Sequence, residues 1–347
     1  MCNVPIRPCF SRLMETETVF LGLMGLSIAI CVLGVVLNVL MLWAIARSRQ
    51  ITRLDFAGNI NLAVADLLCA LLVIAVLVSR LAGTPMAALC QVYACLLSFS
   101  NSLSLYTLIS MCVIHALVFS AGLSMERFRW LFWVCLLWVG SLLCAATPFL
   151  MATAPFVVQP SKLYCTVNFF TENRVYFAFN ISIVAIIFMS PIVIGIGYLN
   201  IYRSLVSVSS ARTNRGEVVT QAQRNIQVTI VRRALYLMVS FGMFWYFPSI
   251  IFTLQIATRK PVTWEWDAMC ACLLLLKNSI NPVVFFLVDP RCKNSLYEIF
   301  GCKTIAEQQR ESCIHDEAKT GYRVKGRVVD LLHGTFDAGL SYEVKTY

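Results

Sequence analysis

Two ionisable side chains of this sequence, Asp66 and Lys277, lie in the middle of long apolar segments. Every other Asp, Glu, Lys and Arg lies in a polar connection, at the end of an apolar segment or in a chain end. A charge inside a membrane or a protein core is costly unless it has a partner. The two residues therefore predict an ion pair between two helices. In the alternative reading, each charge has its own polar neighbours or water.

Polar residues follow Lys277 at a helical spacing. Asn281 comes four residues later and Asn278 lies between them. Side chains three or four residues apart share one face of a helix. This segment is therefore expected to turn a polar stripe toward the interior of a helix bundle.

The other residue types that carry chemistry do not point to catalysis. The three histidines are His115, His315 and His333, and the last two lie in the C-terminal tail. There is no phosphate-binding glycine loop, no HExxH sequence and no paired metal-binding cysteine motif. We therefore expect neither an enzyme nor a metal or cofactor site.

The composition indicates a membrane protein. Hydrophobic residues make up 59% of the 347 residues and charged residues 13%, whereas soluble domains are about 45–50% apolar and about 25% charged. A membrane-spanning helix needs about 20 apolar residues. The sequence thus predicts an all-α membrane protein, a bundle of seven transmembrane helices. The expected spans are 19–46, 56–79, 88–117, 130–151, 175–202, 231–257 and 266–288.

The distribution of charge predicts the orientation. The first, third and fifth loops hold eleven arginines against three acidic residues, Asp55, Glu126 and Glu217. Basic loops stay in the cytoplasm, so the N-terminus is expected outside the cell. The net charge of +10 follows mostly from this asymmetry. It indicates contact with anionic lipid of the bilayer and requires no nucleic-acid partner.

These features divide the chain into four parts. Residues 1–18 form a short extracellular N-terminus and residues 19–288 the seven-helix bundle. Residues 289–302 form a short amphipathic helix on the cytoplasmic membrane surface, and residues 303–347 a cytoplasmic tail.

Short motifs along the spans resemble those of rhodopsin-like (class A) G-protein-coupled receptors. Residues 61–66 read NLAVAD, residues 281–285 resemble NPxxY, and residues 245–248 resemble CWxP. The remaining matches, in order, are Gly34 with Asn38, Trp138 with Pro148, and Pro191. The resemblance covers about residues 19–302. It implies a multi-pass receptor of the plasma membrane that binds an extracellular ligand of unknown identity and signals to a heterotrimeric G protein.

The resemblance also implies roles for individual residues. Cys90 and Cys165 match the family disulfide, and Cys302 after the surface helix is a palmitoylation candidate. The ligand-binding positions are Leu97, Asn101, Phe177, Asn180, Tyr246, Ser249 and Ala271. The polar core is Asn38, Asp66, Ser104, Lys277, Asn278 and Asn281. Leu97 stands where amine receptors have an Asp, which argues against a small amine ligand.

Lys277 departs from the family pattern in an informative way. It stands where an uncharged polar residue is usual around a sodium ion, so its ammonium is expected to take the place of the cation. Opsins place their retinal-binding Lys seven residues before the conserved Pro. Lys277 precedes Pro282 by five, and Leu275 occupies the opsin position. An opsin is therefore not expected.

The switch and coupling residues differ from the family in ways that bear on signalling. The matching positions are His115, Leu123, Tyr198, Tyr246, Pro248, Pro282 and Phe285. His115 replaces the Arg of DRY, Tyr246 stands at the usual toggle Trp, and Phe285 replaces the Tyr of NPxxY. These losses predict atypical G-protein coupling. Two alternatives stay open: His115 is merely a packed residue, or the chain is a non-signalling or decoy membrane protein that binds ligand or other receptors.

Two acidic residues near the outer end of the last span, Glu265 and Asp267, allow a further pair of readings. They attract a cationic ligand, or they form an ordinary solvated rim.

Overall fold

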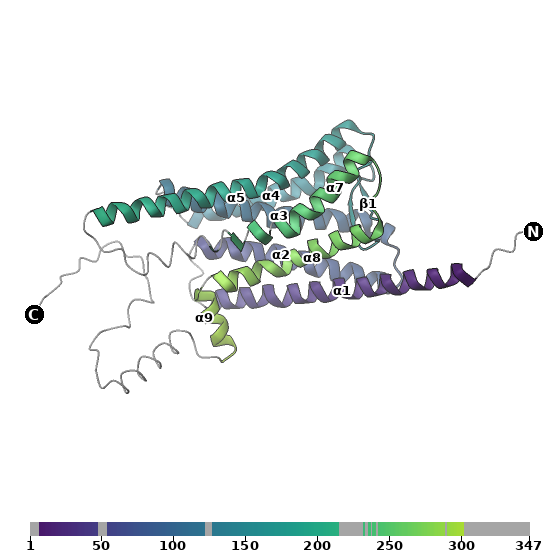
Figure 1. Cartoon of the computed structure of the whole chain (residues 1–347), viewed down its shortest axis with the longest axis horizontal. Helices are drawn as coiled ribbons and strands as arrows, with labels where there is room; N and C mark the ends of the chain where they lie inside the picture. Colours follow the sequence, from purple (N-terminus) through teal and green to yellow (C-terminus); the bar gives the residue numbers. More distant parts are fainter. Residues whose placement is uncertain are drawn as a thin grey trace, which may run out of the picture. The chain divides into compact units, whose positions relative to one another are not determined.

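The computed structural model describes residues 7–47, 54–121, 127–214, 232, 235–236, 238–240, 242–288 and 290–301. Its long helices run alongside one another, with a hairpin at one end and a short helix, α9, at the other (Figure 1). They are α1 (Arg7–Arg47), α2 (Leu54–Leu81), α3 (Met86–Ala121), α4 (Arg127–Met151), α5 (Arg174–Asn214), η1 (Gly242–Tyr246) continued by α7 (Phe247–Thr258), and α8 (Trp264–Val288).

The described part of the chain contains seven helices that are long and apolar enough to cross a membrane. This confirms the seven-helix bundle predicted from the sequence. The helices extend beyond some predicted spans, since α1 begins at Arg7 and α5 continues to Asn214. Hydropathy marks only the part of a helix that fits the hydrocarbon, and a helix can continue beyond it.

A two-stranded hairpin between α4 and α5 was not predicted. Strands β1 (Phe156–Val158) and β2 (Cys165–Val167) pair antiparallel, with Val157 opposite Thr166. Each strand has three residues, too few for an alternating pattern to be visible in the sequence. The hairpin fixes the path of the loop across one end of the bundle, which we call the hairpin end.

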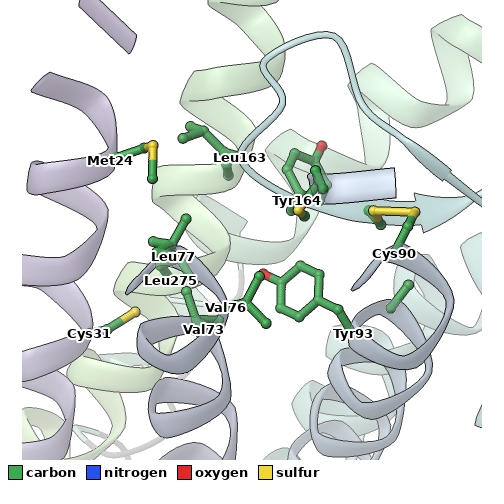
Figure 2. Close-up of a cluster of buried hydrophobic side chains, with 14 of the residues drawn as sticks. Met24, Cys31, Val73, Val76, Leu77, Cys90, Tyr93, Leu163, Tyr164 and Leu275 are labelled. Atoms are coloured by element: carbon green, nitrogen blue, oxygen red, sulfur yellow. A yellow bond between two sulfur atoms is a disulfide. The ribbon is translucent and has the colours of Figure 1, made fainter. Parts of the chain in front are cut away.

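Apolar side chains of the hairpin loop pack into the bundle at this end. Figure 2 shows Leu163 and Tyr164 of the loop above Leu77 of α2, Tyr93 of α3 and Leu275 of α8. All five side chains are buried. The loop is therefore part of the largest hydrophobic cluster rather than a solvated connection.

Small residues let the helices approach closely. A Cβ atom added to Gly197 of α5 would lie 2.6 Å from the Cys112 Sγ of α3, and one added to Gly34 of α1 would lie 3.1 Å from the Ser279 Oγ of α8. A hydrogen-bond chain also joins three helices: Trp138 Nε1 donates to Asn61 Oδ1, and Asn61 Nδ2 donates to Thr107 Oγ1. These contacts set the spacing of the bundle.

The predicted amphipathic helix is present as α9 (Pro290–Ile299). Arg47 Nε, at the end of α1, lies 3.6 Å from Glu298 Oε2 of α9, and both side chains are half exposed. Exposed ion pairs contribute little to stability, typically below about 1 kcal/mol. The pair thus mainly marks where α9 lies against α1.

Candidate functional site

The centre of the bundle holds the two buried charges identified from the sequence. Asp66 on α2 is completely buried, and the Lys277 side chain on α8 is 3% exposed. Lys277 Nζ lies 3.7 Å from Asp66 Oδ1, while Asn281 Nδ2 donates a 2.6 Å hydrogen bond to Asp66 Oδ2. The expected ion pair between these two helices is therefore present, and the one-turn spacing of Lys277 and Asn281 brings both to the carboxylate.

The ammonium of Lys277 has two further neighbours. Nζ donates a 2.9 Å hydrogen bond to Asn101 Oδ1 of α3, and it lies 5.0 Å from the centre of the Trp245 ring in η1. A cation over an indole face is attracted by the ring quadrupole. One side chain thus connects α8 with α2, α3 and η1.

The other predicted polar-core residues are also buried together. Asn38 Nδ2 of α1 donates 2.8 Å hydrogen bonds to the Gly34 carbonyl of its own helix and to the Asn278 carbonyl of α8. Ser104 of α3 is completely buried and contributes to the polar surroundings of Asp66. The hydrogen bond from Asn38 to the Asn278 carbonyl connects α1 to the same core.

A cavity of about 150 Å³ lies between this core and the hairpin. Its walls come from α3, α4, α5, η1, α7 and α8, and residues of the hairpin loop line its end beneath the hairpin. Four of the predicted ligand-binding residues line it: Leu97, Asn101, Asn180 and Ser249. Asn101 connects the two sites, because it lines the cavity and also accepts the hydrogen bond from Lys277.

The structure places Phe177 elsewhere, and Phe179 lines the cavity instead. Asn180 lies on the inner face of α5, and successive residues of a helix are about 100° apart around its axis. Phe177 and Phe179 therefore lie on opposite flanks of that face. The cavity extends toward α4, where Cys144 and Pro148 line it, so the flank of Phe179 borders the cavity.

Ala271 also falls outside the main cavity. It lines a second, smaller space of about 20 Å³ that Leu97, Asn101 and Tyr164 share with the main cavity. Leu274, nearly one turn further along α8, reaches both spaces. The rotation of α8 thus directs Ala271 toward α1 and α2.

Tyr246, predicted to contact ligand and to act as the toggle, is replaced in the cavity wall by Trp245. The Tyr246 ring stacks on Phe188 of α5 at 5.3 Å, and its hydroxyl donates a 3.0 Å hydrogen bond to the Phe188 carbonyl. The cause is the π-helix η1, which spans Gly242–Tyr246. Trp245 lies three residues before Pro248, whereas the Trp of CWxP lies two residues before its Pro. A π-turn holds more residues than an α-turn, and this compensates for the extra residue, so the Trp245 indole still faces inward.

The outer wall of the cavity is fixed by an acidic residue that the sequence suggested as part of an exposed rim. Asp267 of α8 is completely buried. Its Oδ1 accepts a 2.6 Å hydrogen bond from the Tyr164 hydroxyl, and its Oδ2 accepts a 2.8 Å bond from the Ser161 amide. Asp267 therefore neither attracts a cationic ligand nor forms a solvated rim, as the sequence suggested, but binds the hairpin loop. Glu265 is exposed.

Burial and the neighbouring Asp267 carboxylate raise the pKa of the Tyr164 hydroxyl well above its usual range. Tyr164 therefore stays a hydrogen-bond donor at neutral pH. The next residue forms the predicted Cys90–Cys165 disulfide, which is present. Tyr164 was not singled out from the sequence, and Asp267 was named only as a ligand-attracting or solvated rim residue. The sequence signal that could have identified this contact is an acidic residue at the start of an apolar helix, together with a Tyr next to the disulfide cysteine.

The switch residues lie along the inner faces of their helices. Tyr198 and Phe285 are buried, and His115 on α3 is half buried. Pro282 lies within α8, and Pro248 is the second residue of α7. The remaining two predicted residues, Leu123 and Cys302, lie outside the described part of the chain.

Comparisons with known proteins agree with this architecture. A sequence model of the 7 transmembrane receptor (rhodopsin family) matches residues 37–285. A crystal structure of squid rhodopsin superposes with a TM-score of 0.71 at 15% sequence identity, covering 82% of this chain and 81% of the rhodopsin chain. A search of curated proteins finds no match. At this identity the superposition concerns the fold alone. Since the family match spans most of the chain, this protein belongs to the rhodopsin family of seven-transmembrane receptors.

Proposed function

We propose that this membrane receptor binds a ligand in the cavity below the hairpin and transmits a conformational change to a heterotrimeric G protein, with atypical coupling. The observation that carries the proposal is the shared wall between cavity and polar core. Asn101 and Trp245 line the cavity, and both contact the Lys277 ammonium that pairs with Asp66.

This arrangement gives a ligand a physical means of changing the helices. A ligand shifts a conformational equilibrium only by its differential affinity for the two states. A molecule that moves Trp245 or Asn101 alters a contact of a buried ammonium, and that ammonium connects α8 with α2 and α3. The proline-containing helices α7 and α8 supply places where such a change can become a bend.

We place the hairpin end outside the cell and the α9 end in the cytoplasm, at the plasma membrane. The support is the arginine excess of the first, third and fifth loops and a disulfide at the hairpin end, since disulfides persist in oxidising compartments. An epitope tag placed before Met1 is expected to be stained on intact cells, whereas a tag after Tyr347 is expected to need permeabilisation.

The coupling experiment compares the native chain with His115→Arg and His115→Gln at equal surface expression. Basal activation is measured across a panel of G proteins. Activation by the native chain would establish a signalling receptor. Activation by His115→Arg alone, with His115→Gln silent, would show that the missing guanidinium limits coupling.

The competing function is a non-signalling or decoy receptor that binds ligand or other receptors. His115 and Phe285, at positions where the family carries Arg and Tyr, favour it. Silence of the native chain and of both variants decides less than activation does, because an ordinary receptor without agonist is also silent. The family itself is one of receptors rather than enzymes.

A further inference from the structure

We propose that the ligand of the cavity is a small, uncharged, lipophilic molecule with a hydrogen-bond donor, such as an apolar alcohol, and that it enters from the bilayer between α4 and α5. The inference rests on the proposed function only in taking this cavity as the ligand site.

The lining of the cavity excludes a charged ligand. None of the described residues that line it is Asp, Glu, Lys, Arg or His, and aliphatic or aromatic side chains form most of the wall. A buried ionised group without an opposite charge is strongly disfavoured. The nearest ammonium, that of Lys277, is already paired with Asp66 and bonded to Asn101. The volume of about 150 Å³ suits a molecule of roughly the size of one ring or a short chain.

One polar group of the wall calls for a donor on the ligand. Asn180 is 1% exposed and lines the cavity. Its Nδ2 donates a 3.1 Å hydrogen bond to the Asn168 carbonyl, which fixes the orientation of the amide, because the opposite orientation would place two oxygens together. Its Oδ1 has no hydrogen-bond partner in the described part of the protein. A buried acceptor left without a partner is costly, and a small rotation of the Asn180 side chain toward the cavity would allow a ligand hydroxyl to satisfy it.

The hairpin loop forms part of the cavity wall and is fixed to three helices. Tyr164, Cys165 and Phe169 line the outer end of the cavity. The loop is attached to α3 by the disulfide, to α5 through Asn180, and to α8 through Asp267. Opening this end requires several of these contacts to break together.

One residue of the cavity wall on the flank between α4 and α5 is also exposed at the surface of the bundle. Ile186 of α5 lines the cavity and yet is 40% exposed, within a span that faces hydrocarbon. Phe188 stacks against Tyr246 of η1. Residues two positions apart, such as Ile186 and Phe188, point in directions about 200° apart around the helix axis. Ile186 therefore lies on the opposite flank of α5, the one that faces α4, where Pro148 also lines the cavity. A lipophilic molecule in the bilayer meets the cavity here.

The test uses the full chain in lipid nanodiscs and three photoreactive probes that carry the same diazirine: a hexanol, its methyl ether and the corresponding hexanoic acid. Labelled residues are identified by mass spectrometry. We expect the alcohol to label the cavity wall around Trp245 roughly five- to tenfold more than the ether, and the acid not to label it. Asn180→Leu is expected to remove the preference for the alcohol. Equal labelling by acid and alcohol would overturn the ligand class.

The entry route is tested by the rate of labelling with the alcohol. Ile186→Trp is expected to slow labelling several-fold. The matched control is Ile192→Trp, which changes another exposed isoleucine of α5 that does not line the cavity, and it should label at the native rate. Asp267→Asn loosens the loop and is expected to leave the rate unchanged. Acceleration by Asp267→Asn together with no effect of Ile186→Trp would show entry from water and overturn the route.

The same nanodiscs are assayed for activation of purified G protein. A receptor that activates a G protein but is not labelled by the alcohol would refute the ligand class and leave the proposed function intact. Labelling without activation of any G protein would support the binding site and contradict the coupling.

Discussion

Replacing Lys277 by methionine removes the buried ammonium and keeps a side chain of similar length. At the observed 3.7 Å separation from Asp66, the attraction between the two charges is about 4.5 kcal/mol at an effective dielectric constant of about 20. The substitution also leaves Asp66 as a buried charge without its partner. Breaking a buried pair in this way typically costs about 3–5 kcal/mol.

We therefore expect Lys277→Met to lower the apparent thermal midpoint of the receptor in detergent by roughly 5 °C or more at a fixed heating rate. The matched control is Asp66→Asn combined with Lys277→Met, which removes both charges. Replacing a buried pair by neutral groups is often close to neutral, so the double variant should regain most of the lost stability.

The response to sodium tests whether the Lys277 ammonium occupies the place of a sodium ion beside Asp66. Lys277→Ala frees the space of the ammonium and leaves the Asp66 carboxylate, so sodium chloride should raise its thermal midpoint relative to choline chloride at equal ionic strength. The native receptor should respond equally to both salts, and its basal activity should be insensitive to sodium. A native receptor stabilised by sodium, or a double variant as unstable as Lys277→Met, would refute the reasoning.

Two further predictions concern the helix contacts and the hairpin loop. Gly197→Ala should destabilise the receptor by about 1–3 kcal/mol, because the new Cβ would lie 2.6 Å from Cys112 Sγ. The control Gly140→Ala adds a Cβ with no atom within 4 Å and should not destabilise the receptor. Equal thermal midpoints of the two variants would contradict the close contact. The raised pKa of Tyr164 means that its stabilising effect is full below about pH 10 and is lost as the pH rises toward the folded-state value. Thermal midpoints measured from pH 8 to 11 should therefore fall more steeply for the native chain than for Tyr164→Phe, and parallel curves would argue against a buried hydroxyl bonded to Asp267.

Much of the fold was predictable because it depends on properties of single segments. Each span is long and has few charged residues, and the membrane forces such a segment to satisfy its own backbone hydrogen bonds as a helix. The ion pair was also predictable in kind. Asp66 and Lys277 are the two charges in the middle of spans, and a buried charge needs a partner.

The placement of individual site residues was predicted less well, because it depends on helix rotation. Family spacing assigned Phe177 and Tyr246 to the cavity, but the π-turn at Gly242–Tyr246 brings Trp245 inward and the cavity lies on the α4 flank of α5. A shift of one residue turns a side chain by about 100°, and no single segment carries the information that fixes it.

The sequence by itself determined the class of the protein: seven apolar spans, their expected orientation, the disulfide cysteines and the family motifs. These follow from composition and from residue types at fixed spacing along one chain. Only the tertiary structure decided that Asp267 is a buried acceptor for the hairpin loop rather than an exposed acid, and that Asn101 belongs to both cavity and polar core. The physical reason is that burial and hydrogen bonding are properties of contacts between segments far apart in the chain, which form only when the helices pack.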